Sequence, residues 1–69
     1  MPLTLAVPGE EYMIRRIGGN AETRAHLQDL GFVPGATLTV VNSMSGNLIV
    51  SVKGSRVAVS KEMANKIMV

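Results

Sequence analysis

The second half of the chain alternates between apolar and polar residues with the period of two that half-buried β-strands show. This pattern predicts strands at Ala36–Val41, Leu48–Lys53 and Arg56–Ser60. The apolar residues that face inward in these strands are Leu38, Val40, Leu48, Val50, Val52, Val57 and Val59. Between the strands, Ser45–Asn47 predicts a hairpin tip, and Gly54–Ser55 predicts a two-residue loop with glycine in its first position.

The beginning of the chain gives two further strand predictions. Leu3–Ala6 is a short candidate strand that ends at the turn dipeptide Pro8–Gly9. Glu11–Ile17 is the next strand, and we expect a β-bulge in it because the doubled arginine Arg15–Arg16 interrupts the alternation. The inner face of this strand is assigned to Tyr12, Ile14 and Ile17.

A helical pattern replaces the alternation over Ala21–Leu30. Asn20 is a good N-cap for this helix, because its side-chain oxygen can accept a hydrogen bond from a free amide of the first turn. The stripe that faces the core comprises Thr23, Leu27 and Leu30, at spacings of four and three. Gly31 follows at the position where a residue with positive φ commonly ends a helix.

The end of the chain predicts a short helical turn and a last strand. Ser60 can cap the turn at Lys61–Ala64, and Ile67–Val69 can complete a sheet. The elements together predict a mainly β fold, namely a small closed or nearly closed barrel of about five or six short strands with one inserted α-helix and a short C-terminal helical turn. Because no linker or repeat divides the chain, we expect residues 1–69 to form one domain.

The composition is that of a folded domain. Apolar residues make up 46% of the chain and charged residues 17%, whereas disordered segments show the opposite balance. The absence of cysteine excludes disulfides and thiolate metal ligands. The N-terminus lacks a signal-peptide pattern, and no apolar run approaches the ~20 residues of a membrane span. We therefore expect a cytoplasmic protein.

Charge and chemistry argue against nucleic-acid binding and against catalysis. The net charge of +2 is spread along the chain, and Tyr12 and Phe32 are the only aromatic residues that could stack on bases. Catalysis needs nucleophilic or titratable groups that converge in a pocket, but the chain has one histidine, no cysteine and five carboxylates. We therefore expect neither an enzyme nor a bound cofactor.

Glu22, His26 and Asp29 form the candidate metal site of this sequence. They lie at positions i, i+4 and i+7 on one flank of the predicted helix, where such a set of nitrogen and oxygen ligands could hold Fe(II), Zn(II) or Mn(II) weakly. The alternative is a solvated helix face on which His26 borders the apolar stripe. We favour the solvated face, because no other histidine or cysteine is available to complete a site.

Three segments together resemble the FeoA family of bacterial ferrous-iron transport accessory proteins. The segments are Leu27–Gly35, Gly46–Val50 and Lys53–Ser60, the last followed by Glu62–Ala64 and Ile67. The resemblance implies an SH3-like barrel with an inserted helix. It also implies a cytoplasmic protein that acts with FeoB, a membrane Fe(II) transporter with a GTP-binding domain, and that is recruited through this partner to the inner face of the membrane.

The best candidate surface for contact with a partner runs from the end of the predicted helix through the following turn. Leu30, Phe32 and Val33 are large apolar residues in this segment. For Phe32, however, folding back to plug the open end of the barrel is at least as good an expectation. Met44, beside the hairpin tip, is a second candidate because flexible methionine side chains suit adaptable contact surfaces.

The basic residues suggest two further roles beside such a partner. Arg56, with Arg15 and Arg16 as lesser candidates, could supply an arginine finger to the partner's GTP-binding domain. Lys53, Arg56 and Lys61 could form a basic patch that faces anionic lipid headgroups. In both cases we favour ordinary solvated positions, and we predict no direct insertion into the membrane.

Three other functions stay open. A barrel of this type could bind a proline-rich peptide, although two aromatic residues are too few for such a groove. It could bind the body of a metal-dependent repressor, since the resemblance extends to the C-terminal barrel of repressors of the DtxR kind, but this chain lacks their DNA-binding segment. A small metal-binding or metal-sensing protein would depend on Glu22, His26 and Asp29.

Overall fold

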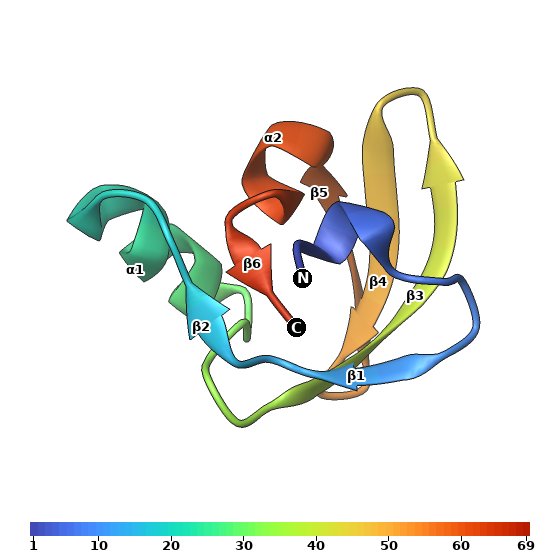
Figure 1. The fold of residues 1–69 in the computed structure, drawn as a ribbon, viewed down its shortest axis with the longest axis horizontal. Helices are drawn as coiled ribbons and strands as arrows, with labels where there is room; N and C mark the ends of the chain where they lie inside the picture. Colours follow the sequence, from blue (N-terminus) through green and yellow to red (C-terminus); the bar gives the residue numbers. More distant parts are fainter.

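Six strands and two α-helices make up the chain in the computed structural model, which describes all residues from 1 to 69. In chain order (Figure 1), the elements are a 3₁₀ turn η1 (Leu3–Leu5), β1 (Glu11–Met13), β2 (Arg16–Ile17), α1 (Ala21–Asp29), β3 (Thr37–Met44), β4 (Asn47–Val52), β5 (Ser55–Ser60), α2 (Lys61–Ala64) and β6 (Ile67–Met68). The predicted mainly β fold with an inserted helix and a C-terminal helical turn is therefore confirmed.

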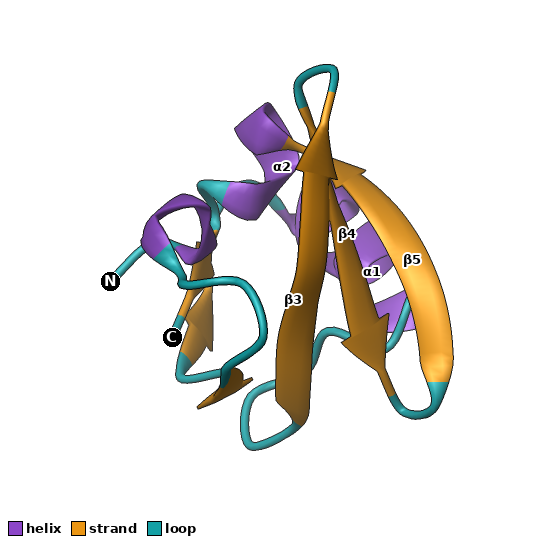
Figure 2. Cartoon of the chain, turned by 90° about the vertical axis from the view of Figure 1, so that its right-hand side faces the viewer, coloured by secondary structure: helices purple, strands orange, loops and turns teal.

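The strands form two antiparallel sheets. One sheet has the order β1-β3-β4-β5, and the other pairs β2 with β6. Figure 2 shows β3, β4 and β5 side by side as a curved layer, with η1 and the N-terminal segment beside it. The two chain ends are bonded to each other: the amide of Val69 donates to the carbonyl of Met1, and the ammonium of Met1 donates to the carbonyl of Val69, each at 2.8 Å.

The core consists of fourteen buried residues, all apolar, and no polar side chain is buried. Both α-helices, η1 and every strand except β1 contribute to it. The buried residues are Leu3, Ile14, Ile17, Leu27, Phe32, Leu38, Val40, Leu48, Val50, Val52, Val59, Ala64, Ile67 and Val69. A core without polar groups has no buried hydrogen bond to satisfy, so its stability derives from apolar burial.

The predicted inner face of the large sheet is confirmed. Leu38 lies opposite Val52, and Val40 lies opposite Val50, so the inner residues of β3 and β4 meet as cross-strand pairs. The register shifts immediately after Val40, at a β-bulge. Strand β3 then continues to Met44, three residues beyond its predicted end at Val41.

Both hairpin loops of the large sheet have two residues with positive φ. Ser45 and Gly46 have φ of 48° and 81°, and Lys53 and Gly54 have φ of 50° and 78°. This pair of positive angles is what a type I′ turn requires. The prediction of a Gly54–Ser55 loop is therefore wrong by one residue: glycine takes the second position of the turn, and Ser55 already pairs with Val52.

The predicted strand at Leu3–Ala6 is wrong, because this segment forms η1. The amides of Leu5 and Ala6 donate to the carbonyls three residues earlier, of Pro2 and Leu3, at 3.0 Å. Leu3 is fully buried whereas Leu5 is 66% exposed, so the two leucines do not share a face as alternation would require. Four residues are too few for periodicity to distinguish a strand from a helical turn.

The predicted strand Glu11–Ile17 divides into β1 and β2, which belong to different sheets. The amide of Ile14 donates to Ala36 at 2.8 Å, on the side of β3, whereas the amide of Arg15 donates to Met68 at 2.8 Å, on the side of β6. The chain changes sheet between these two residues. The interruption that the doubled arginine predicted is real, but it separates two sheets and is not a bulge within one strand.

Both predicted helix caps are confirmed. The Asn20 side chain accepts from the amide of Thr23 at 2.8 Å, and the Ser60 hydroxyl accepts from the amide of Met63 at 3.2 Å. Helix α1 ends one residue before its predicted end, and Gly31 follows with φ of 105°. Leu27 is the only buried residue of α1. The helix therefore stands at the side of the barrel (Figure 1), with most of its surface exposed to solvent.

Candidate functional site

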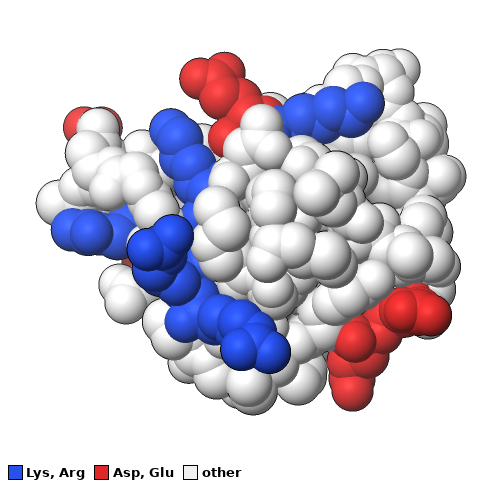
Figure 3. Space-filling model, viewed as in Figure 1, with Lys and Arg blue, Asp and Glu red and all other residues white.

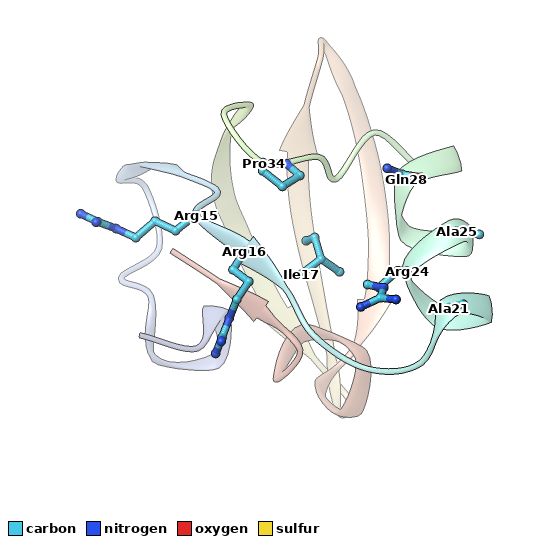
Figure 4. A pocket seen from close by; sticks show the side chains of 8 residues that line it. All are labelled: Arg15, Arg16, Ile17, Ala21, Arg24, Ala25, Gln28 and Pro34. Atoms are coloured by element: carbon cyan, nitrogen blue, oxygen red, sulfur yellow. The ribbon is translucent and has the colours of Figure 1, made fainter.

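A cavity of about 370 Å³ opens at the surface between helix α1 and strand β2 (Figure 4). From α1, Ala21, Arg24, Ala25 and Gln28 line it. From the other side, the residues that line it are Arg15, Arg16, Ile17 and Pro34. It is the one pocket that the structure contains.

The helical residues of this cavity lie on one face of α1. Ala21, Arg24, Ala25 and Gln28 are spaced by three, one and three, so at 100° per residue they fall within one narrow sector of the helix. The buried Leu27 points to the core from a different sector. The helix is thus attached by one face and leaves another to line the cavity, where two alanines keep the space beside β2 open.

The charge of the cavity lining is positive. It includes three arginines and no carboxylate, and all three guanidinium groups are on exposed residues. None of the side-chain hydrogen bonds in the structure involves an arginine. In Figure 4, Arg24 reaches from α1 toward Ile17, whereas Arg16 and Arg15 extend outward from the β2 side, Arg15 farther from α1.

Basic side chains also gather on the surface around the cavity. Figure 3 shows several Lys and Arg side chains gathered over the side of the molecule that carries α1 and β2, and a pair of acidic groups on the opposite side, near β1. Further acidic groups lie at the top and at the left edge of this view, and one basic side chain lies at the upper right. Glu10 and Glu11 belong to that opposite side by their position before and in β1. Helix α1 carries Glu22 and Asp29, but neither lines the cavity.

Phe32 does not form a surface contact. Its side chain is fully buried, and its amide donates to the carbonyl of Leu27 at 2.9 Å, so it closes the core beneath the end of α1. Phe32 therefore plugs the barrel, which was the alternative expectation for this residue. Leu30 and Val33, on either side of it, are half-buried, and Leu30 packs against the core.

The remaining predicted contact residues lie at opposite ends of the large sheet. Met44 pairs with Asn47 next to the first hairpin and is 57% exposed. Arg56 lies beside the second hairpin, at the other end of β4 and β5. Gly31, at the end of α1, lies against Val52 at this second end. The structure therefore brings Leu30, Val33 and Arg56 to one end and leaves Met44 at the other.

The predicted basic patch of Lys53, Arg56 and Lys61 is not formed. Lys53 and Arg56 flank the second hairpin, whereas the amide of Lys61 bonds to the carbonyl of Gly46 in the first hairpin at 3.0 Å. The length of the sheet separates them, which is about 17 Å for six residues per strand. Proximity could not be judged from sequence, because the strand directions decide which residues share an end.

The structure contains no group of three His, Asp or Glu side chains that could hold a metal ion. Glu22, His26 and Asp29 are each exposed on α1. That these residues form an ordinary solvated helix face stays a prediction.

Arg24 and Gln28, which line the cavity, are not among the candidate site residues predicted from the sequence. The signal was present, because both share a helix face with two alanines, yet nothing in the sequence states that β2 lies opposite this face. Three exposed apolar side chains were also not predicted, those of Leu5, Val7 and Met13. Neither α-helix is long and apolar enough to cross a membrane.

The comparisons with known proteins agree with one another. The model of the FeoA domain family matches residues 1–69. A protein of Methanocaldococcus jannaschii named "Putative Fe(2+) transport protein A" is 35% identical over 68 residues, which cover 99% of this chain and 83% of the relative. A crystal structure of an iron uptake regulatory protein, FeoA, superposes with a TM-score of 0.91 at 35% identity and covers 99% of this chain and 92% of its own.

More distant structures agree on the fold. The zinc complex of Stenotrophomonas maltophilia FeoA, described as an SH3 domain protein, superposes with a TM-score of 0.85 at 22% identity, covering 99% of this chain and 87% of its own. A manganese-dependent transcriptional repressor superposes with a TM-score of 0.88 at 17% identity, covering 97% of this chain and 39% of its own. The predicted SH3-like barrel is thereby confirmed, and at these identities the likeness concerns the fold alone.

Proposed function

This chain belongs to the FeoA family, and from that premise we propose that it acts without catalysis, by contact with the cytoplasmic part of a FeoB-type ferrous iron transporter. The family is one of ferrous iron transport accessory proteins and is not a known family of enzymes. The observation that carries the proposal is the family match over residues 1–69 together with the 35% identical relative named for Fe(2+) transport. We place the protein in the cytoplasm, where such a partner would recruit it to the membrane.

The contact surface that we assign to this function is the helix-end surface, defined here by Leu30, Val33 and Arg56. Leu30 and Val33 are half-buried, so each offers apolar area without being free to move. The fully buried Phe32 between them holds this segment on the core. Arg56 adds an exposed cation at the same end, and arginine beside apolar residues is a frequent combination in protein interfaces.

Co-purification of the chain with its FeoB-type transporter tests this proposal. Val33→Asp puts a charge into the helix-end surface, and Arg56→Glu reverses one, so we expect each to weaken capture by about tenfold or more. Met44→Asp is the matched change at the opposite end of the sheet, where we expect about twofold or less. Circular dichroism of each variant verifies that the barrel is intact.

Two results would contradict the proposal at different levels. Failure of the wild-type chain to bind the transporter under any nucleotide or Fe(II) condition would overturn the partner. Wild-type binding that is lost with Met44→Asp and kept with Val33→Asp would overturn the surface, because the contact would then lie at the first hairpin. Comparison of the transporter's GTPase rate with and without Arg56→Ala decides whether Arg56 acts as an arginine finger.

The other functions have less support. The likeness to metal-dependent repressors concerns the fold alone, and the groove of a proline-rich peptide reader would need more aromatic residues than Tyr12 and the buried Phe32. A metal-sensing role would need ligands that converge, and the chain does not bring three candidate side chains together. No specific observation in the structure favours any of these functions.

A further inference from the structure

We propose that the cavity between α1 and β2 binds a phosphate-bearing small molecule, with Arg24 and Arg16 as its two cationic contacts. This site goes beyond the transporter contact proposed above and uses different residues. It belongs to the isolated chain, so it can be tested without a partner. The charge of the lining, the shape of the cavity and the unused hydrogen-bond donors of its arginine side chains all support such a ligand.

The guanidinium groups of this cavity form no side-chain hydrogen bond and face no carboxylate among the lining residues. No carboxylate lines the cavity, and no side-chain hydrogen bond in the structure uses Arg16 or Arg24. A guanidinium presents a planar fork of N–H donors that matches two oxygens of a phosphate, and such charge-assisted bonds are among the strongest hydrogen bonds in proteins. An anion is therefore the ligand that this lining selects.

The geometry assigns different parts to the two arginines. Arg24 points from α1 toward Ile17 (Figure 4). Arg16 stands on the facing strand and extends outward, but it is exposed, and the rotatable bonds of its side chain allow the fork to turn onto a ligand held by Arg24. Arg15 points farther from α1 and contributes to the positive field more than to direct contact.

The shape of the cavity indicates more than a single phosphate ion. A volume of about 370 Å³ falls within the range of about 300–1,000 Å³ that small-molecule sites occupy. Ala21 and Ala25 leave the space open, Ile17 and Pro34 give it apolar walls, and Gln28 offers a neutral amide. This combination suits a phosphorylated molecule whose uncharged part lies against the apolar walls.

An acidic segment of another protein fits the cavity less well. A stable protein contact buries about 800 Å² on each partner, whereas this site is bounded by one face of a nine-residue helix and a two-residue strand. We therefore propose the small ligand, and the experiment below includes an acidic peptide as a competing ligand.

Titration of the ¹⁵N-labelled chain with ATP, pyrophosphate or inorganic phosphate, followed by NMR, tests the site. The buffer is kept at about 150 mM ionic strength, where the Debye length is about 8 Å and long-range attraction is screened. We expect ATP and pyrophosphate to give saturable shifts that concentrate at Arg16, Arg24 and Gln28. Adenosine, which has no charge, is expected to shift none of them.

Substitutions separate a built site from general positive charge. We expect Arg24→Gln to raise the dissociation constant for ATP by about tenfold, as loss of one charge-assisted hydrogen bond does. Arg24→Lys keeps the charge but loses the fork, so we expect an intermediate loss. Lys61→Gln removes the same charge from α2, away from the cavity, and is expected to change the constant by less than twofold.

Several outcomes would overturn the proposal. One is an equal rise of the dissociation constant for ATP with Arg24→Gln and with Lys61→Gln. Another is a set of chemical-shift changes that spread over all basic residues and do not saturate. A third is binding of a hexaglutamate peptide that pyrophosphate does not displace. Saturation by inorganic phosphate as tight as that by ATP would overturn the role of the apolar walls and leave a simple anion site. Every outcome is independent of whether the chain binds a transporter.

Discussion

The phenol oxygen of Tyr12 accepts a hydrogen bond from the backbone amide of Val7 at 2.8 Å, so strand β1 holds the loop that precedes it. Tyr12→Phe removes this acceptor and leaves the ring in place. We expect the free energy of unfolding to fall by about 1 kcal/mol, the usual net value of such a bond. Urea denaturation measures the change, and Met13→Leu, at an exposed neighbour, should alter stability by about 0.5 kcal/mol or less.

Phe32 should be among the most costly residues to truncate. Its side chain is fully buried, so Phe32→Ala creates a cavity and is expected to cost about 3–5 kcal/mol in a domain whose total stability is commonly about 5–15 kcal/mol. Val33→Ala, one position later and half-buried, should cost about 1 kcal/mol. Equal losses in chemical denaturation would contradict the assignment of Phe32 to the core and Val33 to the surface.

Asn20→Ala should act locally on α1. The substitution removes the acceptor for the Thr23 amide, which typically costs about 1 kcal/mol. Because Leu27 is the only buried residue of α1, few contacts hold the helix on the barrel. We therefore expect the helix to open while the barrel stays folded. Hydrogen exchange should accelerate about fivefold for amides of α1 and remain unchanged in β4. Asn20→Asp, which retains a capping oxygen, should restore slow exchange.

The two hairpins offer a stabilising substitution. Ser45 and Lys53 both take positive φ in the first position of a two-residue turn that ends in glycine. Asparagine tolerates this conformation better than either residue, so Ser45→Asn and Lys53→Asn should each add about 0.5 kcal/mol. Thermal unfolding should show this as a rise of about 2–4 °C. Gly54→Ala, which places a Cβ at φ of 78°, should lower the melting temperature instead.

Elements whose signal is local could be predicted from the sequence. Asn20 and Ser60 cap their helices because the acceptor and the amide are three residues apart, and the inner face of β4 follows from an unbroken alternation. The resemblance to the FeoA family extended this prediction to the barrel type. These features depend on neighbours in the chain, so periodicity and cap preferences describe them.

Features that depend on distant segments could not be predicted. The change of sheet between Ile14 and Arg15 is determined by where β3 and β6 lie, and the 3₁₀ turn at Leu3 forms where Pro2 pairs with Met68. The cavity has the same origin, because Arg24 gains its importance only when β2 lies opposite α1. The residues of the cavity can be read in the sequence, but the cavity itself forms only when elements far apart in the chain pack together.

The bonds between Met1 and Val69 also have a consequence for the order in which the parts of this chain are expected to fold. They close the longest loop available, since 68 positions separate the two residues, and loop-closure entropy delays such contacts. The hairpins of β3, β4 and β5 close over two residues each. We therefore expect the meander to form the folding nucleus and the joining of the two termini to be a late event. Val50→Ala should accordingly slow refolding, whereas Ile67→Val should mainly speed unfolding.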